Sequence, residues 1–126
     1  MTQCAPPELQ DVLLELAAAL PGVRIGPSNI CTPGSRGCQL APAVATGPAQ
    51  AFFSGTEFGH VHPSYDGSLH LILPVRLAER VVAAGWGTAA EPDGSVLVYG
   101  PRNEAELETV WQLLLAAYRQ AAPGRA

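Results

Sequence analysis

Residues 56–74 constrain the fold more than any other part of this 126-residue chain, because they predict a β-hairpin that carries all three histidines of the protein. Residues 58–62 and 68–73 alternate in side-chain character, as expected of strands with two different faces. The intervening residues 63–67 contain the proline, aspartate and glycine that are typical of tight turns. We therefore predict two antiparallel strands joined by this turn.

The hairpin is expected to bring its histidines together on one face. Residues two apart on a strand point to the same side. If His62 pairs with Ser68, then His60 lies opposite His70, and the three imidazole rings are within reach of one another. The other face carries valine and leucine side chains and is predicted to pack on the core. A register slip of one residue would turn His70 toward that core.

Grouped imidazoles point to acid/base chemistry, because imidazole titrates near neutral pH. We predict His60, His62 and His70 as catalytic residues, one of which removes a proton from an enol or a carbon acid while another returns it. The alternative is a metal centre, since three histidines in this arrangement could bind zinc or copper.

Other residues are candidates for substrate binding. Phe58 and Ile72 share the strand parity of the histidines and are expected to line the same concave face. Arg36, in a loop, and Arg102, before a helix, could hold an oxyanion or a carboxylate. Tyr99 could donate a hydrogen bond, although a strand tyrosine is also typical of a core.

Glu57 is the strand carboxylate closest to the histidines, but it has the opposite parity. It could orient an imidazole only if the strand bulges, and it can also be interpreted as a paired structural carboxylate. Histidines that bind a metal usually donate their second ring N–H to a carboxylate or carbonyl. In a regular strand Glu57 points away from the histidines and cannot accept this N–H. We therefore predict a protein that works without a metal and without another cofactor.

Composition excludes several classes of function. The net charge is −4, the chain has no lysine and no basic run, and broad binding to nucleic acid is therefore disfavoured. No apolar run is long enough to span a membrane, and the first residues do not resemble a signal peptide. We expect a cytoplasmic protein with a small-molecule substrate, and we leave a homodimer open. The odd set Cys4, Cys31 and Cys38 does not indicate a disulfide scaffold.

The rest of the chain predicts one domain over residues 1–126 that combines helices and strands. A first helix is expected after Pro6 and before Pro21, with one apolar stripe facing the core. That stripe comprises Leu9, Val12, Leu13, Leu16 and Leu20. Further helices are expected at 75–84 and from Asn103 onward, a strand at 95–99, and a frayed tail at 120–126.

The long segment 26–50 is rich in Gly, Pro, Ser and Ala and shows little periodicity. Only its residues 37–40 suggest a strand. An irregular loop of this length is often a lid or a binding loop. We therefore predict an α+β fold in which helices cover one face of a curved antiparallel sheet. This loop is expected to cover the other face, which carries the histidines.

Several segments resemble the luciferase-domain family of bacterial and fungal proteins. They read PGSR at 33–36, EFGHVHP at 57–63, DGSLHL at 66–71, AGWG at 84–87 and VYGPR at 98–102. Fungal luciferases look like oxygenases that act on a hydroxypyrone without an organic cofactor. The resemblance implies the fold and a site around His60, His62 and His70.

The resulting hypothesis is a small-molecule-transforming enzyme of secondary metabolism that makes a natural product. Its histidines would catalyse proton transfer on an enolisable substrate, leading to cyclisation, isomerisation or cofactor-independent oxygenation. Two alternatives remain open. One is a metal-dependent enzyme with the same three histidines as ligands, and the other is a ligand-binding module without chemistry.

Overall fold

The structure, a computed structural model, describes residues 6–28, 34–63, 67–90 and 94–124 and forms one antiparallel sheet with three α-helices. In chain order the elements are α1 (Pro7–Ala18), β1 (Val23–Pro27), β2 (Arg36–Leu40), the 3-10 turn η1 (Ala49–Ala51), β3 (Glu57–Val61), β4 (Leu69–Ile72), α2 (Val75–Ala83), β5 (Gly87–Ala89), β6 (Ser95–Val98) and α3 (Glu104–Ala121). The strands lie in the order β1-β2-β3-β4-β6-β5. The predicted α+β class is confirmed.

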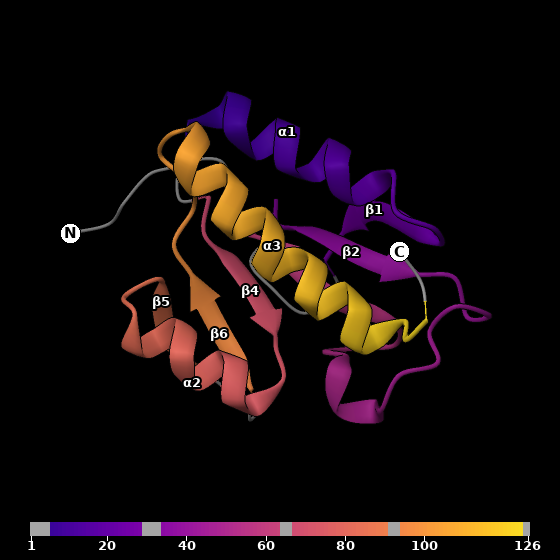
Figure 1. Cartoon of the computed structure of the whole chain (residues 1–126). Coiled ribbons are helices and arrows are strands. Elements are labelled where there is room, and N and C mark those ends of the chain that lie inside the picture. Colours follow the sequence, from indigo (N-terminus) through magenta and orange to yellow (C-terminus); the bar gives the residue numbers. More distant parts are fainter. Residues whose placement is uncertain (1–5, 29–33, 64–66, 91–93, 125–126) are drawn as a thin grey trace.

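All three helices lie on the same side of the sheet (Figure 1). α3 crosses β3 and β4, α1 packs beside α3 and β1, and α2 covers β5 and β6. The core lies between the helices and one face of the strands, where Val61, Leu69 and Val98 meet Leu114 and Tyr118. The opposite face of the sheet is therefore free to carry polar side chains.

The N-terminus of α3 is capped as the sequence predicts. The Asn103 side chain accepts a hydrogen bond from the backbone N–H of Glu106 at 2.9 Å. In the usual capping box the glutamate returns to the N-cap N–H, whereas Glu106 accepts from the N–H of Arg102 and pairs with its guanidinium. At the other end, the Tyr118 hydroxyl donates to the carbonyl of Pro21 at 2.8 Å and ties α3 to the turn before β1.

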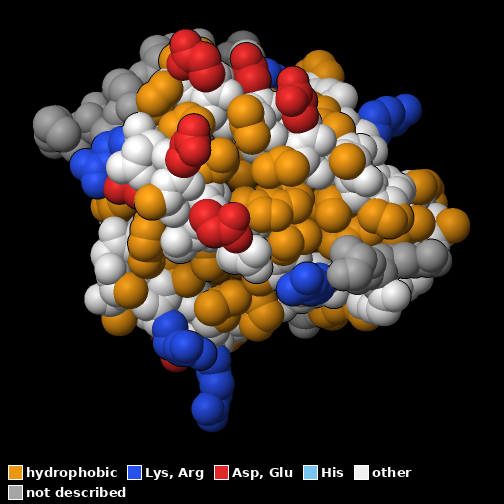
Figure 2. All heavy atoms as spheres, turned by 45° about the horizontal axis from the view of Figure 1, so that its top comes forward, with side chains coloured by type: hydrophobic (Ala, Val, Ile, Leu, Met, Phe, Trp, Pro, Cys, Tyr) orange, Lys and Arg blue, Asp and Glu red, His pale blue; other side chains and the backbone are white. Residues whose placement is uncertain are grey.

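The prediction of the apolar stripe on α1 is wrong in part. Leu13, Leu14 and Ala17 are its buried apolar residues, whereas Val12 and Leu16 are 38% and 39% exposed. Apolar side chains surround much of this helix, so its packing against α3 and β1 decides which of them are buried. Figure 2 shows the helix side with a broad hydrophobic area and acidic side chains gathered along its upper edge.

The prediction of one irregular loop over 26–50 is also wrong, because β1 and β2 form a hairpin within it. Residues 41–48, the irregular part, pack at the end of α3, where the N–H of Gly47 donates to the carbonyl of Ala121 at 2.9 Å. This part therefore lies on the helix side and does not cover the histidine face. Residues 29–33 fall outside the described residues.

Two smaller expectations differ from the structure. β5 was not predicted, because it is a short edge strand that follows directly on the glycines after α2. The tail does not fray from residue 120, since α3 continues to Ala121, and both Ala121 and Ala122 are fully buried. None of the helices in the described ranges has the length and apolar character needed to cross a membrane.

Phe58 and Phe53 provide a test of this core. Phe58 is completely buried, and its ring packs at 5.8 Å against that of Tyr118, whereas Phe53 is only partly buried. We expect Phe58→Ala to lower the free energy of unfolding by about 3–5 kcal/mol, and Phe53→Ala to lower it by less than half as much. Urea denaturation measures both. Equal losses would contradict the position of Phe58 in the core.

Candidate active site

The three histidines lie where the hairpin register predicts them. β3 and β4 pair antiparallel with His60 opposite His70, and the backbone N–H of His62 donates to the carbonyl of Ser68 at 2.8 Å. The ring of His60 is 5.1 Å from that of His70 and 5.3 Å from that of His62, each in an edge-on arrangement. We call the side of the sheet that carries His60, His62 and His70 the histidine face.

A β-bulge in β3 brings Glu57 to this face. Cys38 of β2 pairs with Gly59, but the next residue, Gln39, pairs with Glu57, so Phe58 is the extra residue of the bulge. The bulge follows a tight turn in which the N–H of Glu57 donates to the carbonyl of Ser54 at 3.0 Å. The bulge places Glu57 on the same face of the sheet as the histidines. Glu57 can therefore orient an imidazole, which a regular strand would not allow.

The Glu57 carboxylate is buried between β1 and β3. Its Oε2 atom lies 2.9 Å from Nδ1 of His60 and accepts a hydrogen bond from the Ser28 hydroxyl at 2.9 Å. The side chains of Glu57 and His60 are each 1% exposed. A carboxylate in this position holds the imidazole proton on Nδ1 and leaves the lone pair of a neutral ring on Nε2.

Gly37 makes room for this carboxylate. It is the cross-strand neighbour of His60, and a Cβ atom at this position would lie 2.6 Å from Oε1 of Glu57. On its other side Gly37 pairs with Gly26, where an added Cβ would meet nothing within 4 Å. A side chain at position 37 would thus displace the carboxylate, while one at position 26 would not.

These two glycines give a matched pair of substitutions. Gly37→Ala should displace Glu57 from His60 and lower the free energy of unfolding by about 1–3 kcal/mol, the cost of breaking a buried hydrogen bond. Gly26→Ala, on the neighbouring strand, should be close to neutral. Urea denaturation and the ring ¹⁵N shifts of His60 report both effects. An unchanged His60 spectrum in Gly37→Ala would contradict the contact.

The other two histidines are each held by a serine hydroxyl. Nδ1 of His62 lies 2.9 Å from Oγ of Ser68, and Nε2 of His70 is in close contact with Oγ of Ser95. Each imidazole therefore has one nitrogen engaged with an oxygen of the protein, which restrains its ring orientation. The corresponding partner of His60 is the Glu57 carboxylate.

Phe53 packs over the imidazoles. Its ring centroid is 4.5 Å from that of His70 and 5.1 Å from that of His60. Phe53 follows η1 and is held by its backbone N–H, which donates to the carbonyl of Glu57 at 2.8 Å. Sequence reasoning therefore missed Phe53, as it missed Ser28 and Ser95, because nothing in the local pattern reports contacts between separate segments.

The predicted substrate-binding residues divide between the two sides of the sheet. Ile72 is buried, shares the strand parity of His70 and lies outside the core cluster, as expected. The placement of Phe58 is wrong, because the bulge turns its ring into the core against Tyr118. Arg36 is also misplaced, since its guanidinium reaches Asp11 of α1 at 3.6 Å on the helix side.

Tyr99 and Arg102 lie at a different hollow. They line it together with Ala84, Gly85, Trp86 and Glu106. Arg102 is engaged there by the Glu106 carboxylate at 2.6 Å, which lowers the pKa of Glu106 through hydrogen bonding. The structure therefore does not bring either residue to the histidine face, and neither holds an oxyanion beside His60.

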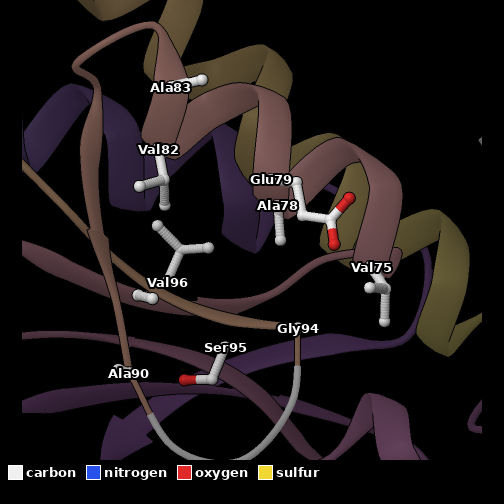
Figure 3. Close-up of a pocket in the computed structure, with 10 residues that line it drawn as sticks. Val75, Ala78, Glu79, Val82, Ala83, Ala90, Gly94, Ser95 and Val96 are labelled. Atoms are coloured by element: carbon white, nitrogen blue, oxygen red, sulfur yellow. The ribbon is translucent and has the colours of Figure 1, made fainter.

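A larger apolar hollow of about 450 Å³ lies between α2 and the β5–β6 edge (Figure 3). Ala78 and Val82 of α2 point toward Val96 of β6, while the hydroxyl of Ser95 points away from the helix. Since Ser95 reaches His70 on the other side of the sheet, this hollow and the histidine face are separated by the strands. We therefore do not assign the hollow to the chemistry of the histidines.

Cys38 lies beneath the site, on the core side of β2. Burial raises the pKa of its thiol from 9.0 to about 12, and repulsion from the Glu57 carboxylate adds to the effect. The thiol therefore stays protonated and unreactive at neutral pH. Cys4 and Cys31 fall outside the described residues.

The thiol of Cys38 predicts a loss of stability at alkaline pH. The unfolded chain would release this proton near pH 9 and the native protein only near pH 12, so the contribution is complete below pH 9 and disappears as the pH rises toward 12. Relative to Cys38→Ala, the wild type should lose about 2 kcal/mol of unfolding free energy between pH 7 and pH 10.5. Urea denaturation at the two pH values tests this. Parallel changes in both proteins would contradict it.

No group of three histidine, cysteine or acidic side chains within the described ranges is arranged to hold a metal ion. The ring nitrogens engaged by Glu57, Ser68 and Ser95 restrain the rings, but the arrangement does not form a ready coordination site. The metal alternative therefore gains no support from this part of the chain.

Fold and site together define a small α+β protein with a histidine network on the face of its sheet that the helices leave open. The chain belongs to the luciferase-domain family, whose model matches residues 55–117, half of its length. The matched range includes the bulge and the hairpin but not β1 and β2. Ser28, which directly follows β1, and Gly37 of β2 therefore lie outside it.

Luciferases of three Armillaria fungi are similar to this chain. The protein of Armillaria ostoyae is 34% identical over 70 residues, and those of Armillaria gallica and Armillaria mellea are each 33% identical over the same length. The aligned stretch covers 48% of this chain and 26% of each relative. No solved structure matches significantly.

Proposed function

We propose that this protein is an enzyme that uses His60 as a general base on a small, enolisable organic molecule. The observation that carries the proposal is the Glu57–His60 pair, because it directs one ring nitrogen to a buried carboxylate and leaves the other without a hydrogen-bond partner among the described residues. A base prepared in this way can take a proton from an enol or a carbon acid. The similar fungal proteins are luciferases, which supports catalysis on a small molecule.

His70 and His62 suit the return of the proton. Both are partly exposed, and the His70 ring lies 5.1 Å from that of His60. A substrate bound against this face could give a proton to one ring and receive it from another. Cyclisation, isomerisation and cofactor-independent oxygenation all can begin with such a proton removal, so the site is compatible with each of them in secondary metabolism.

The experiment measures proton removal directly. Hydroxypyrones and 1,3-diketones are incubated with the protein in D₂O, and exchange at carbon is followed by NMR. We expect the wild type to accelerate exchange and His60→Gln to be slower by roughly a hundredfold, the usual contribution of a general base. A chelator should change little. Exchange that is lost on chelation would instead identify the histidines as metal ligands, and binding without exchange would indicate a ligand-binding module.

Glu57 can be tested as a positioning residue in the same assay. Glu57→Gln keeps the shape of the side chain but removes its charge, and we expect a tenfold to hundredfold lower exchange rate, the usual effect of losing such a partner. Glu106→Gln removes a carboxylate at the separate hollow and is the matched control. Equal rates for the two variants would show that His60 does not depend on its carboxylate.

A further inference from the structure

Three buried polar atoms at this site have no hydrogen-bond partner among the described residues. They are Oγ of Ser35, Oε1 of Glu57 and Nε2 of His60, and the three residues are between 1% and 3% exposed. Buried polar atoms in native proteins are nearly always paired, since an unpaired one loses its water without compensation. These three atoms are therefore candidates for binding a polar group of a ligand.

The register places the three residues on the same side of the sheet. Ser35 directly precedes β2 and lies two residues before Gly37, so it has the parity of Gly37, which is the cross-strand neighbour of His60. The Glu57 carboxylate lies over Gly37, as the 2.6 Å approach to an added Cβ shows. Ser28 links the group, because its N–H donates to the carbonyl of Ser35 and its hydroxyl to Glu57.

The chemistry of these atoms restricts what can bind. A carboxylate oxygen only accepts hydrogen bonds, and Nε2 of a neutral His60 whose proton is on Nδ1 also only accepts. The Ser35 hydroxyl can donate or accept. Arg36, the residue after Ser35, does not supply a cation here, since its guanidinium reaches Asp11 on the helix side. A ligand group at this point must therefore supply donors, and an anion would be repelled by the Glu57 carboxylate.

We propose that Ser35, Glu57 and His60 form a subsite for a hydrogen-bond-donating group of the substrate, such as a hydroxyl, and that this subsite rejects anionic groups. This inference rests on the proposed function in one respect: a His60 that acts as a general base is a neutral imidazole. The partly exposed rings of Phe53, His62 and His70 each contact the ring of His60 and border the subsite.

The test uses three probes that share one ring. Phenol has a hydroxyl donor, anisole has the same oxygen without a donor, and benzoate carries an anion. Each is titrated into the full chain while the ring resonances of His60 are followed by NMR. We expect phenol to bind at least tenfold more tightly than either of the others. Equal affinities, tighter binding of benzoate, or no binding of any probe, as expected if water alone satisfies the three atoms, would overturn the proposal.

Variants separate the subsite from general effects on folding. Ser35→Ala should weaken phenol at least fivefold and leave anisole unchanged, whereas Thr46→Ala, a hydroxyl deletion on the helix side, should affect neither. Glu57→Gln replaces an acceptor by a group that can donate, so the preference for phenol over benzoate should fall at least tenfold. An unchanged preference in both site variants would overturn the proposal.

Binding of these probes does not depend on turnover, so the two proposals fail differently. Selective phenol binding without carbon exchange in D₂O would retain the subsite and reject the enzyme. Exchange with unselective probe binding would retain the enzyme and reject the subsite.

Discussion

The contact between the buried Glu57 carboxylate and Nδ1 of His60 is the interaction on which the site depends. A buried carboxylate is costly unless it is hydrogen-bonded, so its surroundings must supply partners. Ser28 and His60 supply them, and the missing side chain of Gly37 supplies the space. β2, β3 and the residue that follows β1 thus cooperate to hold one carboxylate beside one imidazole.

The sheet divides the molecule into two chemical environments. Its helix side is apolar and closed by α1, α2 and α3, while its other side collects carboxylate, imidazole and hydroxyl groups. The bulge in β3 is where this division is set, because it sends Phe58 into the core and Glu57 to the histidines. The same irregularity therefore contributes both to packing and to the site.

Membership of the luciferase-domain family is consistent with this arrangement, since the matched residues 55–117 contain Glu57 and all three histidines. Ser28, Ser35 and Gly37 lie before that range, on the β1–β2 hairpin. The residues that surround the Glu57 carboxylate, and the Ser35 hydroxyl of the proposed subsite, therefore come from the N-terminal third of the chain. The family match does not include that part.

The sequence by itself determined the hairpin, the start of the last helix at Asn103 and, on the condition that His62 pairs with Ser68, the shared face of the three histidines, because strand alternation, turn chemistry and helix starts are local properties. Only the tertiary structure decided the orientation of Glu57 and the positions of Phe58 and Arg36. These depend on a bulge opposite β2, on contact with Tyr118 and on an ion pair with α1, which join residues far apart in the chain.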